Sequence, residues 1–336
     1  MKQLICSTRK SLVFLSLMLF SATLLLSADD PIRVGVIGLD TSHSPAFAKL
    51  LNDPDATGEL AGFDVVAAYP KGSADIESSV SRIPKYTQQF RDMGVEIVDS
   101  IDELLEQVDV VLLETNDGRP HYQQALQVIQ AGKPLFVDKP VAASLVDVVR
   151  IYDAAAEYNV PVFSSSSLRY YGFADSIANG AAGDVVEANT WSPAPIEITH
   201  PDLYWYGIHG VEMLFTAMGT GCETVIRASS DGSDVVTGLW SDGRIGTFRG
   251  LRQAQRGYGG TVFGTEAVMD MGGYNGYEPL VREIATFFKT GQAPVSPEET
   301  LEIYAFMTAA DLSKRLNGQP VNLQAVLDDA IRQARE

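Results

Sequence analysis

The chain has 336 residues, with 43 Asp and Glu against 25 Lys and Arg, which gives a formal net charge of −18 at pH 7. Such an acidic surface argues against nucleic acid and anionic lipid headgroups as partners. The length predicts about two domains. Cys6 lies in the N-terminal segment, so Cys222 would be the only cysteine of a processed chain, and no intrachain disulfide is expected.

The N-terminus has the composition of an export signal. Lys2, Arg9 and Lys10 precede an apolar run over residues 11–26, and two small residues follow. This pattern predicts a signal peptide over residues 1–28 and an exported, periplasmic protein. Leu26 occupies a position where signal peptidase prefers a small residue, so an uncleaved membrane anchor is the alternative. Residues 8–12 loosely match a twin-arginine signal, which leaves the Sec and Tat routes open.

Apolar runs alternate with helical patterns in the first half of the chain. The predicted strands are residues 32–37, 63–69, 95–99, 108–113, 135–137 and 160–164, and the predicted helices are residues 46–51, 102–107, 121–131 and 145–158. Buried strands separated by helices indicate βαβ units and a parallel sheet. We therefore predict an α/β chain that begins with a doubly wound Rossmann domain over residues 31–165.

The pattern changes after residue 164 to short strands separated by turn residues. The strands are expected at residues 185–191, 224–228, 235–240, 245–249, 260–263 and 267–271, with a hairpin signal at 241–244 and helices at 206–218, 278–289 and 297–316. This order predicts a C-terminal α+β domain over residues 166–336, with a mostly antiparallel open sheet.

The most informative motif is Asp138-Lys139-Pro140, which follows the apolar strand at 135–137. Open α/β sheets place their chemistry at the carboxyl ends of strands. Proline restricts the residue before it, so Lys139 should be well oriented. A buried ammonium group needs a partner, and Asp138 or Glu114 could supply the counter-charge. A purely structural ion pair is the alternative interpretation.

The order of motifs resembles the Gfo/Idh/MocA oxidoreductases, the family of glucose–fructose oxidoreductase and inositol dehydrogenase. Asp138-Lys139-Pro140 is similar to the family's Glu-Lys-Pro motif, whose lysine touches substrate and nicotinamide. Thr115-Asn116 with Pro120-His121 resembles its cofactor-contacting loop. Gly207-Ile208-His209 resembles the helix that carries its catalytic histidine. The resemblance covers nearly the whole chain after the predicted signal peptide.

The resemblance implies a Rossmann domain that binds NAD or NADP, and hydride exchange at a carbinol of a sugar or cyclitol. It also implies homo-oligomers packed through the open sheet. An exported enzyme lacks ready access to soluble nicotinamide, so a tightly bound cofactor is expected. One alternative is an NAD-dependent glycosidase, which oxidises its sugar transiently; some exported members of the family resemble such enzymes. The other is an inactive secreted carbohydrate-binding or scaffold protein.

The first strand-to-helix turn departs from the Gly-x-Gly-x-x-Gly pattern of dinucleotide-binding folds. Only Gly38 fits, because Asp40 and His43 occupy the second and third glycine positions. A carboxylate at position 40 would repel a diphosphate, although Thr41 and Ser42 could donate to phosphate or cap the helix. The alternative is that Asp40 and Ser42 only stabilise the turn and bind no cofactor.

Cofactor contacts are nonetheless assigned to this turn, to the loop after the third long strand and to the motif at 138. The predicted set is Gly38, Asp40, Thr41, Ser42, Lys71, Thr115, Asn116, His121 and Asp138. Lys71 could hold a 2′-phosphate, which would favour NADP, or it could lie in a solvated loop. For His121, the alternative to a cofactor contact is a structural role.

His209 is the predicted general base on the carbinol, with Lys139 assisting. The family usually carries an aspartate four residues before this histidine, whereas this chain has Trp205, so Tyr204, Tyr206 or Glu212 would have to substitute. A packed core histidine is the alternative.

Polar and aromatic residues at the entrance to the second domain suit a sugar. Arg169, Tyr170 and Tyr206 are the predicted substrate contacts, and ordinary linker residues are the alternative for the first two. No metal is expected, because the histidines and carboxylates show no tight ligand spacing. The sequence leaves open which sugar is used, whether NAD or NADP binds, the direction of reaction and the size of the oligomer.

Overall fold

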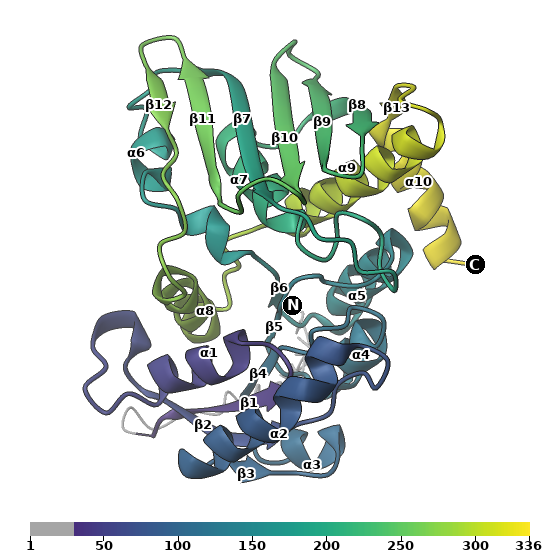
Figure 1. Ribbon diagram of the computed structural model, residues 1–336. Helices are drawn as coiled ribbons and strands as arrows, with labels where there is room; N and C mark the ends of the chain where they lie inside the picture. Colours follow the sequence, from purple (N-terminus) through teal and green to yellow (C-terminus); the bar gives the residue numbers. More distant parts are fainter. Residues whose placement is uncertain (1–29) are drawn as a thin grey trace, which may run out of the picture. The chain divides into compact units, whose positions relative to one another are not determined.

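Six parallel strands form the first sheet, in the order β3-β2-β1-β4-β5-β6 (Figure 1). They are β1 (Ile32–Ile37), β2 (Phe63–Tyr69), β3 (Glu96–Ile97), β4 (Val110–Leu113), β5 (Leu135–Val137) and β6 (Val162–Phe163). The computed structural model describes residues 30–336, so the predicted signal peptide at residues 1–28 lies outside the described residues. The strand order confirms the predicted doubly wound sheet and puts its switch point between β1 and β4.

The connections of the first sheet are mostly helical. The helices are α1 (His43–Leu51), η1 (Gly58–Leu60), α2 (Glu77–Asp92), α3 (Ile101–Leu105), α4 (His121–Gln130) and α5 (Leu145–Tyr158). Ser100 and Ser144 cap α3 and α5 by accepting hydrogen bonds from backbone N–H groups. We did not predict α2, because it is polar along most of its length and contains Pro84.

The second sheet has seven strands, in the order β12-β11-β7-β10-β9-β8-β13. They are β7 (Val185–Pro193), β8 (Cys222–Ser229), β9 (Ser233–Trp240), β10 (Ile245–Leu251), β11 (Gly259–Gly264), β12 (Val268–Asp270) and β13 (Val321–Asn322). Only the pair β7–β10 is parallel, so the mostly antiparallel sheet is confirmed. The predicted hairpin joins β9 to β10, where Gly243 has φ +91°.

The remaining helices are η2 (Ser167–Tyr170), α6 (Ala174–Ala178), α7 (Ile208–Met218), α8 (Glu278–Thr290), α9 (Pro297–Arg315) and α10 (Leu323–Ala334). Helices α7 and α9 pack on the second sheet (Figure 1). The unpredicted β13 and α10 complete this half, and α10 packs against α5 and α9. No helix in the described part of the chain is long and apolar enough to cross a membrane.

Helix α8 crosses back from the second half of the sequence to the first sheet. Its buried side chains Leu280, Ile284 and Phe287 share one apolar cluster with Val34 and Phe47. Residues 31–336 accordingly form one compact unit. The change of sheet falls between β6 and β7, near the predicted boundary at 165, but the first sheet needs α8 to cover it.

Candidate active site

A cavity of about 220 Å³ opens at the carboxyl ends of β1, β4 and β5. The second half of the chain supplies the facing wall. The lining residues are Thr41, Ser42, His43, Ser78, Arg82, Asn116, Lys139, Ser167, Leu168, Trp205, Tyr206, His209, Tyr258, Tyr274 and Tyr277. Pockets for drug-sized ligands usually measure about 300–1,000 Å³, so this cavity suits a ligand the size of a single sugar ring.

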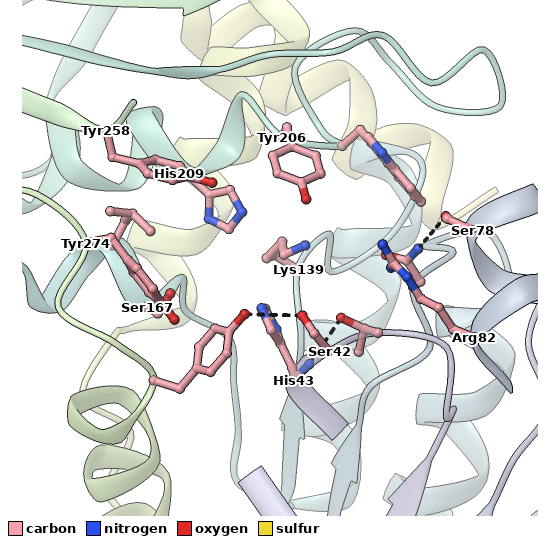
Figure 2. Close-up of a pocket in the computed structure, with 15 residues that line it drawn as sticks. Ser42, His43, Ser78, Arg82, Lys139, Ser167, Tyr206, His209, Tyr258 and Tyr274 are labelled. Atoms are coloured by element: carbon pink, nitrogen blue, oxygen red, sulfur yellow. Dashed lines mark hydrogen bonds between the residues drawn. The ribbon is translucent and has the colours of Figure 1, made fainter. Parts of the chain in front are cut away.

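Lys139 lies in the middle of the cavity, with His209 and Tyr206 on one side and His43 and Ser42 on the other (Figure 2). The residue is 6 % exposed, and its Nζ lies 5.5 Å from the centre of the Tyr206 ring, which is within cation–π range. Among residues 30–336 Lys139 forms no ion pair with a carboxylate. The expected direct partners Asp138 and Glu114 therefore do not neutralise it by contact.

His209 lies in the first turn of α7, and its Nδ1 is 2.7 Å from Ser166 Oγ. Burial lowers the pKa of His209 well below its ordinary value, and the nearby charges of Lys139 and His43 add to this effect. The imidazole is therefore neutral at neutral pH. When Nδ1–H donates to Ser166 Oγ, Nε2 is left unprotonated and able to accept a proton.

Three buried ionisable groups cluster behind Lys139. The His43 imidazole donates from Nδ1 to Asp138 Oδ2 at 2.7 Å, and one atom from each of His43, Glu114 and Asp138 lies within 4.8 Å of the others. Burial opposes ionisation of Asp138, yet the charges of His43 and Lys139 hold its pKa below the ordinary value. Burial and the Asp138 charge raise the pKa of Glu114 well above its usual range. Asp138 therefore loses its proton more readily than Glu114 does.

The same three side chains are the types that hold metal ions, although the sequence spacing did not reveal them. Both Glu114 oxygens and Asp138 Oδ1 lack hydrogen-bond partners among the described residues. His43 Nδ1, however, is already hydrogen-bonded to Asp138. Because nothing tests metal binding, the absence of a bound metal stays a prediction.

The Gly38 turn is filled by the side chain of Asp40. Its Oδ1 accepts from Asn116 N at 2.9 Å, and its Oδ2 accepts from Ser79 Oγ at 2.6 Å. A Cβ on Gly72 would lie 2.2 Å from Asp40 Oδ2, so the loop after β2 closes directly over the carboxylate. Burial raises the pKa of Asp40. The Asp40 carboxylate is wholly buried and bonded within the protein and does not line the cavity, so the geometry gives no support to its predicted contact with a cofactor.

Gly38 and Thr115 meet each other and do not line the cavity. Gly38 has φ +92°, and a Cβ there would lie 2.4 Å from Thr115 N. The glycine is thus required for close packing of two backbone segments. Their predicted contacts with a cofactor find no support in this geometry.

Hydrogen bonds and ion pairs fasten the loop after β2 to the loop after β4. Arg119 donates to both Asp75 oxygens, at 2.7 and 2.8 Å, and also pairs with Asp117. Ser73 Oγ donates to Asp117. Burial opposes ionisation of Asp117, but hydrogen bonds from His200, Arg119 and Ser73 hold its pKa far below the ordinary range. These contacts hold the loop after β2 over the Asp40 side chain, at the turn where a Rossmann fold usually seats a diphosphate.

Lys71 and His121, two further predicted contacts, also lie outside the cavity. Lys71 is exposed, with its Nζ 5.5 Å from the Tyr69 ring centre. His121 is wholly buried, and its ring nitrogens lie 2.6 Å from Thr115 O and 3.1 Å from Val141 O, which is a structural arrangement.

Arg169 and Tyr170, the predicted substrate contacts, do not line the cavity. Arg169 is held by Glu212 at 2.8 Å and Glu299 at 2.7 Å. Glu212 is therefore engaged, and its pKa is raised by burial. Tyr204 is buried, with its hydroxyl 2.7 Å from Thr308 Oγ1. Of the three suggested substitutes for the missing aspartate, only Tyr206 lines the cavity.

Several residues that line the cavity were not predicted from the sequence. Ser78 and Arg82 belong to α2, which we did not predict. Tyr258 directly precedes β11, and Tyr274 and Tyr277 lie just before α8, all outside the predicted elements. Tyr277 also bridges the two halves, since its hydroxyl lies 3.2 Å from Ser42 Oγ.

Residues 32–166 match a protein-family model described as an oxidoreductase family with an NAD-binding Rossmann fold, Gfo/Idh/MocA. An uncharacterized oxidoreductase of Streptococcus pneumoniae serotype 4 is 29 % identical over 105 residues, which cover 30 % of this chain. The match spans only 28 % of that relative's own length.

Solved structures share the fold over most of the chain. A probable dehydrogenase from Thermotoga maritima is 21 % identical, with a TM-score of 0.70, over 88 % of this chain and 100 % of that one. The myo-inositol 2-dehydrogenase of Lactobacillus plantarum is 16 % identical, with a TM-score of 0.70, over 87 % and 99 %. The scyllo-inositol dehydrogenase of Lactobacillus casei, solved with NAD(H) and scyllo-inositol, is 14 % identical, with a TM-score of 0.69, over 88 % and 100 %.

The parallel sheet, the placement of Lys139 at the end of β5 and the match over residues 32–166 agree. The first domain, over residues 32–166, therefore matches the Gfo/Idh/MocA oxidoreductase family.

Proposed function

We propose that the chain is an oxidoreductase that uses NAD or NADP to exchange hydride at a carbinol of a sugar or cyclitol. One observation carries the proposal: Lys139 at the end of β5 and His209 at the start of α7 come from different halves of the chain and line the same cavity. Proton transfer to a positioned side chain is the step that carbinol oxidation requires of the protein.

The proton has a defined route. His209 is neutral, so its Nε2 can accept the hydroxyl proton as the carbinol is oxidised, while Ser166 holds the ring through Nδ1. The Lys139 ammonium donates a hydrogen bond to the same oxygen. Its positive charge also disfavours protonation of the His209 imidazole before the substrate binds. The dinucleotide, when bound, accepts or supplies the hydride.

The walls of the cavity support a carbohydrate ligand. Tyr206 and Tyr258 stand edge-on to the His209 ring, at 5.5 and 5.8 Å between ring centres. Tyrosines present an apolar ring face together with a hydroxyl, which suits the C–H and O–H surfaces of a sugar ring. The inositol dehydrogenases that share the fold act on cyclitols of comparable size.

The test begins with the cofactor. The purified protein would be denatured, and the released small molecules examined for NAD and NADP by mass spectrometry, followed by turnover assays on a panel of sugars and cyclitols. Lys139→Ala and His209→Ala should abolish turnover and leave the circular dichroism spectrum unchanged. Full activity in both variants would refute the site assignment.

One observation favours a second candidate, a carbohydrate-binding protein that uses no dinucleotide. Asp40 fills the turn in which a Rossmann fold seats its diphosphate, and Asn116 N and Ser79 Oγ fix it there. Absence of released cofactor, together with no binding of added NAD or NADP and retained sugar binding, would support this candidate over the first.

Export to the periplasm, with the cofactor held tightly, is part of the same proposal and rests on the signal-like residues 1–28. N-terminal sequencing of the protein recovered from a periplasmic fraction would test it. An intact N-terminus in the membrane fraction would support the uncleaved anchor.

We further propose a homo-oligomer formed through the second sheet. A row of facing residues crosses five strands, in the order Leu239, Ile245, Glu187, Phe263 and Val268. The four apolar members are 38 to 66 % exposed, which is unusual on one row of a sheet. Ile245→Lys should lower the mass measured by light scattering, and a monomeric wild-type chain would exclude the assembly.

A further inference from the structure

Arg82 is an unpaired cation in the wall of the cavity. It lies on the second turn of α2, and its one hydrogen bond within the described chain is a long one, from Nη1 to Asp40 O at 3.3 Å. Across residues 30–336 no carboxylate pairs with it, although Asp and Glu outnumber Lys and Arg by 43 to 25. A partly buried arginine without a counter-ion in so acidic a chain implies that its partner comes from outside.

The cavity as a whole is electropositive. Lys139 and Arg82 both line it, and none of the described lining residues is Asp or Glu. The nearest carboxylates stand behind the wall and are already engaged, Asp40 by Asn116 N and Ser79 Oγ and Asp138 by His43. A small cavity lined by cations favours a ligand with negative charge.

Uncharged donors accompany the guanidinium. Ser78 lies one turn before Arg82 on α2, and its hydroxyl is 3.4 Å from Asn116 Nδ2 (Figure 2). Ser42 and Thr41 line the cavity at the N-terminal end of α1. A planar guanidinium fork with neighbouring hydroxyls is the donor set that binds phosphate or carboxylate oxygens bidentately.

The position of this set explains how the fold can retain an anion site after losing its glycine turn. Asp40 occupies the usual diphosphate seat with its carboxylate turned into the protein, and its backbone carbonyl is bonded to Arg82. We propose that Arg82 and Ser78 form an oxyanion-binding site on α2, which takes over the anion-holding role of the glycine turn. The ligand is a phosphate or carboxylate group.

Two sources can supply that group, the diphosphate of the dinucleotide or an acidic substituent on the sugar. The inference rests on the proposed function for its biological meaning but not for its test, because binding of a simple anion requires no turnover.

The experiment is titration calorimetry of the full purified chain with four probes: inorganic pyrophosphate, NAD, glucuronate and glucose. The variants are Arg82→Gln and, as the matched control, Arg91→Gln, which removes the same charge from an exposed position on the same helix. Arg82→Gln should weaken binding of pyrophosphate or glucuronate by about tenfold or more, the value of one lost charged hydrogen bond. Arg91→Gln and the affinity for glucose should change less than about twofold, within the range of surface substitutions.

The pattern of losses across the four probes shows whether the dinucleotide or the sugar supplies the anionic group. A parallel loss for pyrophosphate and NAD assigns the site to the dinucleotide, whereas a loss confined to glucuronate assigns it to the substrate. Equal effects of the two glutamine variants, or a wild-type chain that binds neither pyrophosphate nor glucuronate, would overturn the proposal. Melting temperatures of both variants establish that each is folded, and Arg82→Lys should recover part of the affinity through charge alone.

Discussion

The carboxyl ends of β1 and β5 lie close together but have opposite characters. After β5, Lys139 faces an open cavity and forms no ion pair among the described residues. After β1, Asp40 is wholly buried and saturated by hydrogen bonds from Asn116 N and Ser79 Oγ. The end that would carry the chemistry is exposed to ligand, whereas the end that would seat a diphosphate is sealed by the protein itself.

This difference shows that subsites of one fold can diverge independently. The match to an oxidoreductase family covers the first sheet and Lys139, but a match of this kind does not imply that each phosphate contact is kept. The anion-holding role can move to a neighbouring helix when a turn becomes structural. Four predictions test the contrast between the two strand ends.

The largest expected effect is at the reactive end. His209→Ala should lower kcat/KM by about 10²–10⁴-fold, because it removes the group that accepts the proton. Ser166→Ala should cost much less, since it only holds the ring, and should act mainly by changing the pH profile of kcat/KM. Steady-state kinetics across pH would measure both. Equal losses in the two variants would mean that His209 is a packed core residue.

At the sealed end the effect should be on stability. Asp40→Ala leaves Asn116 N–H and the Ser79 hydroxyl buried without an acceptor, at a cost of roughly 1–3 kcal/mol each. Urea unfolding would measure the loss. Asp40→Asn is the matched control, because it keeps an acceptor oxygen and should recover at least part of that loss. An alanine variant as stable as wild type would show that water replaces the carboxylate and that the turn is not sealed.

Glu114, between the two ends, should make stability depend on pH. Its pKa is raised in the folded state by burial and by the Asp138 charge. The folded chain therefore binds more protons than the unfolded one, so this group's contribution is complete below about pH 4.3 and is lost as the pH rises toward the folded pKa.

Glu114→Gln removes that proton linkage. The free energy of unfolding of the variant relative to wild type should rise with pH, by at most about 1.4 kcal/mol per pH unit. Urea titrations at several pH values between 4 and 8 would follow it. A constant difference across that range would mean that Glu114 is not protonated in the folded chain.

The smallest effect is expected where the second half touches the β1 end. Tyr277→Phe removes the hydrogen bond to Ser42 and should destabilise the chain by about 0.5–1.5 kcal/mol. Thermal unfolding would detect the shift. Ser42→Ala should have a similar effect, and the double substitution should cost less than the sum of the two, because both remove one interaction.

The strands were predictable where the sequence has an apolar run bounded by turn residues. The bounds predicted for β2 and β5 match the structure, and so do those of α5. In contrast, α2 was missed because it is mostly polar, so that its helical spacing of apolar residues is weak, and because Pro84 lies inside the helix. The short β13 and the terminal α10 were also missed. They pack against β8, α5 and α9, which are distant from one another in the sequence and come together only in the folded chain.

The site was predictable only where a local motif fixes it. Lys139, Tyr206, His209, Thr41, Ser42 and Asn116 line the cavity as expected. Arg169 was misplaced, because its partners Glu212 and Glu299 are 43 or more positions away in the sequence. The role of Asp40 depends on Ser79 and on a backbone amide at 116, so local spacing could not reveal that its carboxylate would be enclosed.

The return of α8 to the first sheet has a consequence for how the chain can be divided. Phe287 packs edge-on against Phe163 at 4.7 Å between ring centres, and Leu280 and Ile284 are fully buried in the same cluster. A fragment that ends after β6 would leave the other side of this cluster facing water, so it should aggregate when expressed alone. During synthesis, this face of the first sheet stays uncovered until α8, which ends at Thr290, has left the ribosome. The earliest half of the chain is thus completed by one of its last helices.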